Sequence, residues 1–68
     1  MKYFIVKADK NGNRFYKKNK TVDGWSGEGF KRYCWRFSKQ GAKQICDRLN
    51  RSDYTHTYYF IPAEEVTQ

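Results

Sequence analysis

The spacing of hydrophobic residues changes from that of a strand to that of a helix at Ser38. Before it, Tyr33, Trp35 and Phe37 alternate with polar or small residues, which is the period of a strand with one buried face. After it, apolar residues recur at the three-and-four spacing of a single helix stripe, at Ala42, Ile45, Cys46 and Leu49. This stretch is therefore predicted to be a strand that leads directly into a helix.

Both ends of the predicted helix carry residues that suit a cap. Ser38 is predicted to cap the N-terminus, because its hydroxyl can accept a hydrogen bond from a free amide of the first turn. Asn50 is predicted to close the C-terminus in the left-handed conformation. The apolar stripe is too narrow for the helix to fold alone, so we expect the helix to cover the sheet face that carries Tyr33, Trp35 and Phe37.

The first twenty residues are predicted to form a β-hairpin. Two alternating runs, residues 3–10 and 14–20, flank the pair Asn11-Gly12. Asn-Gly readily accepts the positive φ angles of a two-residue type I′ turn. Such a turn would place Ala8 opposite Phe15 on the core face and would turn Tyr16 to the open face.

Two segments remain. Residues 21–30 contain three glycines around Trp25 and predict an irregular connection, in which Trp25 either folds over the core or faces a partner. Residues 54–61 are rich in Tyr, Thr, Phe and Ile and predict a last strand that Pro62 ends. The inward face of that strand stays open, because Tyr58 and Phe60 compete with Tyr59 and Ile61.

These elements predict an α+β fold of three or four antiparallel strands with one helix on one face, in the order β-β-β-α-β. A chain of 68 residues allows one small core, so residues 1–62 are expected to form a single domain and residues 63–68 a loose acidic tail. No apolar run approaches the roughly 20 residues of a membrane span, and the apolar block at residues 1–6 is too short for a signal peptide. A cytoplasmic location is expected.

The charge is distributed unevenly. Residues 1–52 hold all 14 Lys and Arg against four acids, a net charge of +10, whereas residues 53–68 carry −3. A basic body favours a negatively charged partner. We expect nucleic acid or an acidic protein surface rather than a membrane or a small-molecule substrate. The oligomeric state is left open.

The predicted strands collect basic and aromatic residues on the sheet face that the helix leaves uncovered. Cations displace counterions from phosphates, and an aromatic ring can stack on a base. Together with Trp25 from the connection, the predicted residues for binding nucleic acid or another partner are Lys7, Arg14, Tyr16, Lys18, Trp25, Arg32 and Arg36. The alternative is an ordinary solvated face, since exposed sheet faces are usually polar.

Catalytic, metal and cofactor chemistry are not expected. The acidic residues are not grouped for acid-base work, and a single imidazole, His56, does not complete a zinc site. Cys34 and Cys46 fall on opposite faces and are predicted to be reduced thiols. The arginines on either side of Cys34 would favour its thiolate, but no base stands ready to complete a nucleophilic site. The chain is expected to act by binding alone.

The junction Phe37-Ser38-Lys39-Gln40-Gly41-Ala42 resembles the Phe-Ser/Thr-x-x-x-Ala step of small phage and prophage proteins, including the arm-site DNA-binding domains of integrases. Over residues 3–50 this resemblance implies a three-stranded sheet laid in the DNA major groove, with contacts from Lys7, Arg14, Tyr16, Lys18, Arg32 and Arg36. Gly41 stands where that family often has an acidic residue, and the strand at residues 54–61 has no counterpart there. The chain also resembles phage-encoded inhibitors such as anti-CRISPR proteins, which implies an alternative function in binding a host or antiviral protein.

Overall fold

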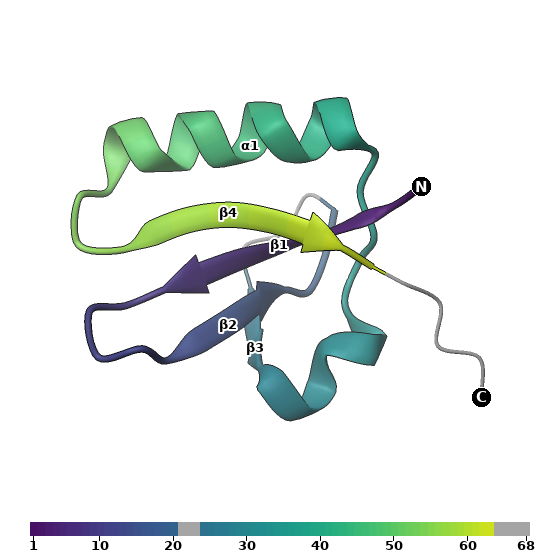
Figure 1. Ribbon diagram of the computed structural model, residues 1–68, viewed down its shortest axis with the longest axis horizontal. Helices are drawn as coiled ribbons and strands as arrows, with labels where there is room; N and C mark the ends of the chain where they lie inside the picture. The colour runs from purple at the N-terminus through teal and green to yellow at the C-terminus, as the bar shows by residue number, and fades with distance from the viewer. Residues whose placement is uncertain (21–23, 64–68) are drawn as a thin grey trace.

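The computed structural model describes residues 1–20 and 24–63. In this part of the chain one α-helix crosses an antiparallel sheet with the strand order β3-β2-β1-β4 (Figure 1). The elements are β1 (Tyr3–Ala8), β2 (Arg14–Lys17), β3 (Trp25–Gly27), the 3₁₀-helix η1 (Glu28–Tyr33), α1 (Lys39–Ser52) and β4 (Thr57–Pro62). The predicted α+β class and the order β-β-β-α-β are confirmed. No helix within the described ranges is long and apolar enough to cross a membrane.

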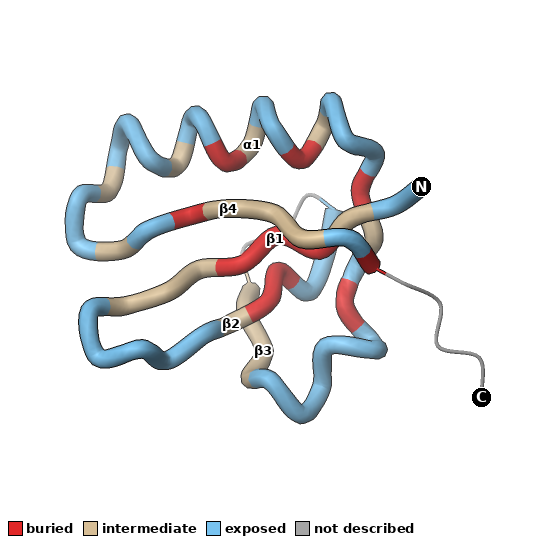
Figure 2. The backbone as a smooth tube through the Cα atoms, viewed as in Figure 1, coloured by how far each residue is buried: buried red, intermediate tan, exposed pale blue. Residues whose placement is uncertain are grey.

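The sheet has a core on each side, and β1 contributes to both. Its residues Phe4, Ile5 and Val6 are buried in succession, which is the pattern of a strand covered on both faces (Figure 2). Ile5 packs on the side of α1, in one cluster with Ala42, Cys46 and Tyr58. Phe4 and Val6 pack on the other side, in a cluster with Tyr16, Cys34 and Ala63. The sheet therefore leaves no open face along β1.

The β1–β2 turn is longer than predicted because Asp9 organises it. The Asp9 carboxylate accepts hydrogen bonds from the backbone N–H groups of Asn11 and Asn13, both at 2.9 Å. The N–H of Gly12 donates to the carbonyl of Asp9 at 3.1 Å, and Gly12 has a φ of +89°. These bonds favour a three-residue loop that ends in a left-handed glycine. The predicted two-residue turn would have needed positive φ at Asn11 as well.

The longer loop shifts the hairpin register by one residue, so the predicted pairing is wrong. Val6 pairs with Tyr16, and Ala8 pairs with Arg14 rather than with Phe15. Because side chains alternate along a strand, this shift turns each β2 side chain to the opposite face. Tyr16, predicted on the open face, lies in the core instead.

The third strand is β3, which lies in the segment predicted to be an irregular connection. It pairs antiparallel with β2, with Ser26 opposite Tyr16 and Trp25 opposite Lys17. Trp25 is half-buried, and its ring centroid lies 5.8 Å from that of Tyr58 beneath α1. Of the two roles left open for Trp25, the structure shows packing against the core. Residues 21–23 of the predicted connection lie outside the described residues.

The strand predicted at residues 33–37 is wrong. This segment ends η1 and then crosses the end of the sheet, where Phe37 joins Tyr3 in an isolated bridge with N–H···O distances of 2.7 and 2.8 Å. Phe37 is buried, but Tyr33 and Trp35 are 76% and 46% exposed. These two rings therefore do not form the covered face that the alternation predicted.

α1 begins as predicted and ends later than predicted. The Ser38 hydroxyl accepts a hydrogen bond from the N–H of Gly41 at 3.1 Å, and the predicted stripe faces the sheet. The helix continues past Asn50, so the predicted role of Asn50 as a left-handed closing residue is wrong. Its side-chain amide instead bonds the backbone N–H and C=O of Tyr58, both at 2.9 Å.

β4 resolves the competition between its two sets of apolar residues, because both sets are covered. Tyr58 and Phe60 pack on the α1 side, whereas Tyr59 and Ile61 pack on the opposite side. Ala63, assigned by the prediction to the acidic tail, is 5% exposed and donates its N–H to the carbonyl of Lys2 at 2.8 Å. The remainder of that predicted tail, residues 64–68, lies outside the described residues.

The turn after α1 is expected to make the free energy of unfolding depend on pH in the acidic range. Asp53 accepts hydrogen bonds from the Thr55 hydroxyl, the Tyr58 hydroxyl and the Thr55 N–H, which hold the pKa of Asp53 well below its usual range. A carboxylate with a lowered folded pKa stabilises the fold above its unfolded pKa of about 3.9, and this contribution disappears as the pH falls further. We expect Asp53→Asn to lower the urea midpoint at pH 7 and to weaken its fall below about pH 4. Circular dichroism at a series of pH values checks this, and an unchanged pH profile would contradict it.

Candidate nucleic-acid interface

The predicted binding residues do not share one open sheet face. Tyr16 is fully buried, and its hydroxyl donates to the Glu28 carboxylate at 3.1 Å. Arg14 is exposed but forms an ion pair with Glu28 at 3.1 Å. Lys7 lies on the α1 side of the sheet with its Nζ 4.8 Å from the ring centroid of Trp25. Four of the predicted residues, Tyr16, Arg14, Lys7 and Trp25, therefore have structural partners within the domain.

The other three predicted residues lie at one end of the sheet or on η1. Lys18 and Arg32 are exposed, and Arg36 is half-buried with its guanidinium 5.2 Å from the ring centroid of Phe4. Lys18 and Arg36 are both near enough to Cys34 to act on its thiol electrostatically. The structure thus brings Lys18 and Arg36 together. Arg36 is carried by the segment that crosses the end of the sheet and not by the predicted strand at residues 33–37.

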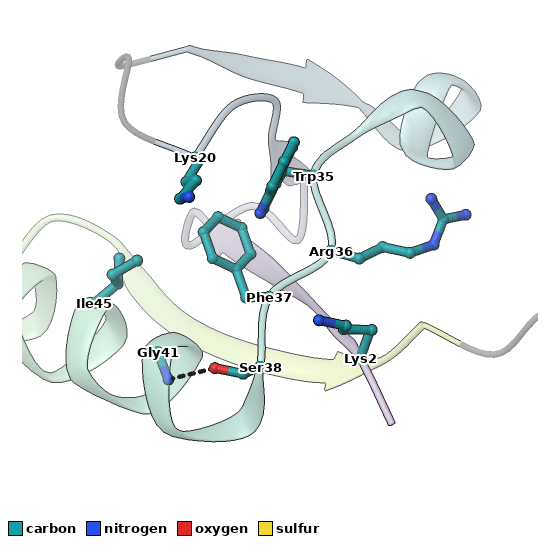
Figure 3. A pocket seen from close by; sticks show the side chains of 8 residues that line it. All are labelled: Lys2, Lys20, Trp35, Arg36, Phe37, Ser38, Gly41 and Ile45. Carbon is teal, nitrogen blue, oxygen red and sulfur yellow. Dashed lines mark hydrogen bonds between the residues drawn. The ribbon is translucent and has the colours of Figure 1, made fainter.

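An open pocket of about 370 Å³ lies where the chain crosses from η1 to α1 (Figure 3). Its lining combines three cations with an exposed indole, a polar helix cap and apolar walls. The lining residues are Lys2, Lys20, Trp35, Arg36, Phe37, Ser38, Gly41 and Ile45. Among the described residues no carboxylate belongs to this lining, which suits an anionic group next to a flat ring.

Three separate segments bring these side chains together. Lys2 precedes β1, Lys20 follows β2, and Trp35 and Arg36 belong to the segment that crosses the end of the sheet. The backbone N–H of Trp35 donates to the carbonyl of Lys18 at 3.1 Å, which ties the crossing segment to the end of β2. The Nζ of Lys20 lies 5.8 Å from the Trp35 ring centroid, and Figure 3 shows both side chains beside the same opening.

Exposed aromatic rings are concentrated in the segment that leads into the pocket. Phe30, Tyr33 and Trp35 are 63%, 76% and 46% exposed, and the Arg32 guanidinium lies 6.0 Å from the Tyr33 ring centroid. Large exposed aromatic residues close together in the chain are candidates for an interaction surface. Trp35 lines the pocket, and the exposed rings of Phe30 and Tyr33 precede it in the same segment.

The described acidic side chains are occupied outside the pocket. Glu28 pairs with Arg14 and Lys31, and Asp47 pairs with Lys43 at 3.1 Å. The other two described acids hold turns: Asp9 in the β1–β2 loop and Asp53 after α1. None of these four described carboxylates therefore belongs to the pocket lining.

The two cysteine thiols are buried in the core. Cys34 and Cys46 are buried on opposite sides of the sheet and form no disulfide, so the prediction that they lie on different faces is confirmed. Burial raises the pKa of the Cys34 thiol even though Lys18 and Arg36 act against it, so the predicted preference for thiolate is wrong. Burial also raises the pKa of Cys46, to about 11. Neither thiol has the low pKa of a nucleophile at neutral pH.

Sequence reasoning missed Lys2, Lys20 and Trp35. Trp35 was assigned to a buried strand face, and the two lysines lie just outside strands, where no periodicity identifies them. Within the described residues, no three His, Cys, Asp or Glu side chains are grouped to hold a metal ion. Comparisons with protein-family models, curated proteins and solved structures find no match. The geometry of the pocket is therefore the basis for a functional proposal.

Proposed function

We propose that this protein is a non-enzymatic nucleic-acid-binding module of phage or mobile-element origin that acts in the cytoplasm. The observation that carries the proposal is the grouping of Lys2, Lys20 and Arg36 with the exposed Trp35 around one open pocket. The binding surface is placed at the end of the sheet rather than on the sheet face, because both faces of β1 are covered.

The chemistry of this surface suits a phosphate backbone. Ammonium and guanidinium groups displace condensed counterions from phosphates, and the release of these ions drives association. Lys18 and Arg32 are exposed cations that can extend the contact beyond the pocket. An exposed indole adds a stacking surface that accepts any base, so binding of this kind has little sequence preference.

Salt dependence tests the proposal. The three pocket cations, or five with Lys18 and Arg32, predict a log–log slope of affinity against salt of about −2 to −3.5 on a single strand, at about −0.7 per phosphate contact. Fluorescence anisotropy of a labelled 12-nucleotide oligonucleotide, titrated between about 50 and 200 mM salt, measures this slope. Absence of binding at the lowest salt concentration, to single strands and duplexes alike, would exclude the proposal.

A second candidate function is inhibition of a host or antiviral protein. The observation that favours it is the exposed set Phe30, Tyr33 and Trp35 beside Arg32, because aromatic residues and arginine dominate the energetics of protein interfaces. A protein partner held mainly by these rings would bind with weak salt dependence. The slope measured above therefore separates the two functions.

A further inference from the structure

The residues that line the pocket also indicate whether it binds single-stranded or duplex nucleic acid. We infer that the pocket takes one unpaired nucleotide of a single strand, with its base against Trp35 and its phosphate at Lys20, while Lys2 and Arg36 contact a neighbouring phosphate of the same strand. This inference rests on the proposed function and names the substrate class of that same pocket.

The size of the pocket favours one nucleotide unit. A volume of about 370 Å³ is near the lower end of the roughly 300–1,000 Å³ that small-molecule pockets occupy. A base can enter such a space only when it has left the stack, because a duplex presents its base edges in the grooves and keeps the flat faces covered. A single strand offers those faces without the free-energy cost of opening base pairs.

Trp35 is held in place and still offers its ring. Its backbone N–H is bonded to Lys18 at the end of β2, and its two neighbours along the chain contact the domain, Cys34 in the core and Arg36 over the Phe4 ring. The side chain nevertheless remains 46% exposed. A backbone anchored in this way need not be ordered when a base stacks on the ring, which lowers the entropic cost of binding.

Lys20 is the lining cation beside the Trp35 ring, and the other two lie across the crossing segment from it. Lys20 approaches the Trp35 ring to 5.8 Å, while Lys2 and Arg36 enter the lining from the opposite side of the crossing segment (Figure 3). The N–H of Gly41 at the start of α1 is already bonded to Ser38. The phosphate of the stacked nucleotide is therefore assigned to Lys20, and a neighbouring phosphate to Lys2 and Arg36, rather than to this amide.

Tryptophan fluorescence tests the inference directly. In a Trp25→Phe background Trp35 is the sole indole, since the chain has two tryptophans. We expect a 12-nucleotide oligothymidylate to quench Trp35 emission and to bind roughly tenfold or more tightly than a 12-base-pair duplex, because only the single strand can stack a base. A duplex that binds equally well, or a single strand that binds without quenching, would overturn the inference.

Substitution of the ring supplies the matched comparison. We expect Trp35→Ala in the otherwise unchanged chain to weaken oligothymidylate binding roughly tenfold and to change duplex binding less than twofold, with Trp35→Phe intermediate. Tyr54→Ala, which removes a ring that is 89% exposed beyond the C-terminal end of α1, should leave both affinities unchanged. Circular dichroism confirms that each variant is folded.

The outcomes separate the inference from the function on which it rests. If Trp35→Ala binds oligothymidylate like the unchanged protein and binding still falls steeply with salt, stacking is excluded and the nucleic-acid-binding function stands. If the unchanged protein binds neither oligonucleotide at low salt, both fail. Loss of single-strand preference in Trp35→Ala with retained salt dependence supports both.

Discussion

Replacing Tyr16 with alanine is expected to unfold most of the protein at room temperature. Tyr16 is fully buried, its ring meets that of Phe4 edge-on at a centroid distance of 5.9 Å, and its hydroxyl bonds Glu28. Truncation of a buried aromatic residue costs about 3–5 kcal/mol, which is comparable with the whole stability of a domain this small. Far-UV circular dichroism during thermal unfolding measures the loss.

Two further variants show that the effect comes from burial. Tyr16→Phe keeps the ring, so it should remain folded and lose only the contribution of the hydroxyl, about 1.5–3 kcal/mol for a hydrogen bond to a charged group. Tyr33→Ala removes a tyrosine that is 76% exposed, and it should change the free energy of unfolding by less than about 0.5 kcal/mol. A Tyr16→Ala protein that melts within a few degrees of the unchanged chain would contradict the placement of Tyr16 in the core.

The second large effect concerns binding. The triple variant Lys2→Glu, Lys20→Glu and Arg36→Gln is expected to lower nucleic-acid affinity roughly a hundredfold or more, because each lost charge-assisted hydrogen bond contributes about 1.5–3 kcal/mol. The salt slope on a single strand should become shallower by about 2. Arg36 is changed to Gln because its side chain is half-buried over Phe4, where a carboxylate would be costly.

A charge-matched variant makes this result specific to the pocket. Lys10→Glu, Arg48→Glu and Arg51→Gln remove the same amount of positive charge from exposed positions at the hairpin tip and on α1. We expect this variant to keep most of its affinity, since long-range attraction between exposed charges is screened at physiological salt. Equal losses in the two variants would show that net charge, and not the pocket, governs binding.

The helix was predictable because its determinants are local. Ser38 caps it, and the stripe of Ala42 and Cys46 meets the sheet as the spacing indicates. The sequence of β4 also carries information about burial, but this information can be interpreted only if the sheet has a core on each side. Two competing apolar sets on one strand indicate burial on both faces, which the expectation of a single covered face could not accommodate.

The errors have two physical causes. The register of the hairpin depends on the Asp9 carboxylate, whose hydrogen bonds to Asn11 and Asn13 favour the longer loop over the one that Asn-Gly suggests. The alternation of large rings predicts the third strand at residues 33–37, but ring size does not determine burial there. The small Cys34 side chain fits against the backbone of β2, 3.7 Å from the carbonyl of Tyr16, while its larger neighbours Tyr33 and Trp35 remain in water.

The shifted hairpin register and the missing strand at residues 33–37 also change which residues form the candidate binding site. Arg36, Lys18 and Arg32 were identified from composition and alternation, and they stay near the proposed surface. Tyr16 lies in the core because of the register shift, whereas Trp35 became accessible because the predicted strand does not form. Lys2 and Lys20 enter the site only through the tertiary fold, since they lie on either side of the crossing segment (Figure 3).

The amide of Asn50 has a consequence for self-association. β4 borders the sheet, and an uncovered border strand invites another chain to extend the ladder, which is a common origin of fibrils. A second molecule that approached β4 would find the main-chain groups of Tyr58 already satisfied by Asn50 and would meet Pro62, which has no N–H to offer. This border therefore offers fewer main-chain hydrogen-bonding groups to an added strand than a fully open edge of the same length.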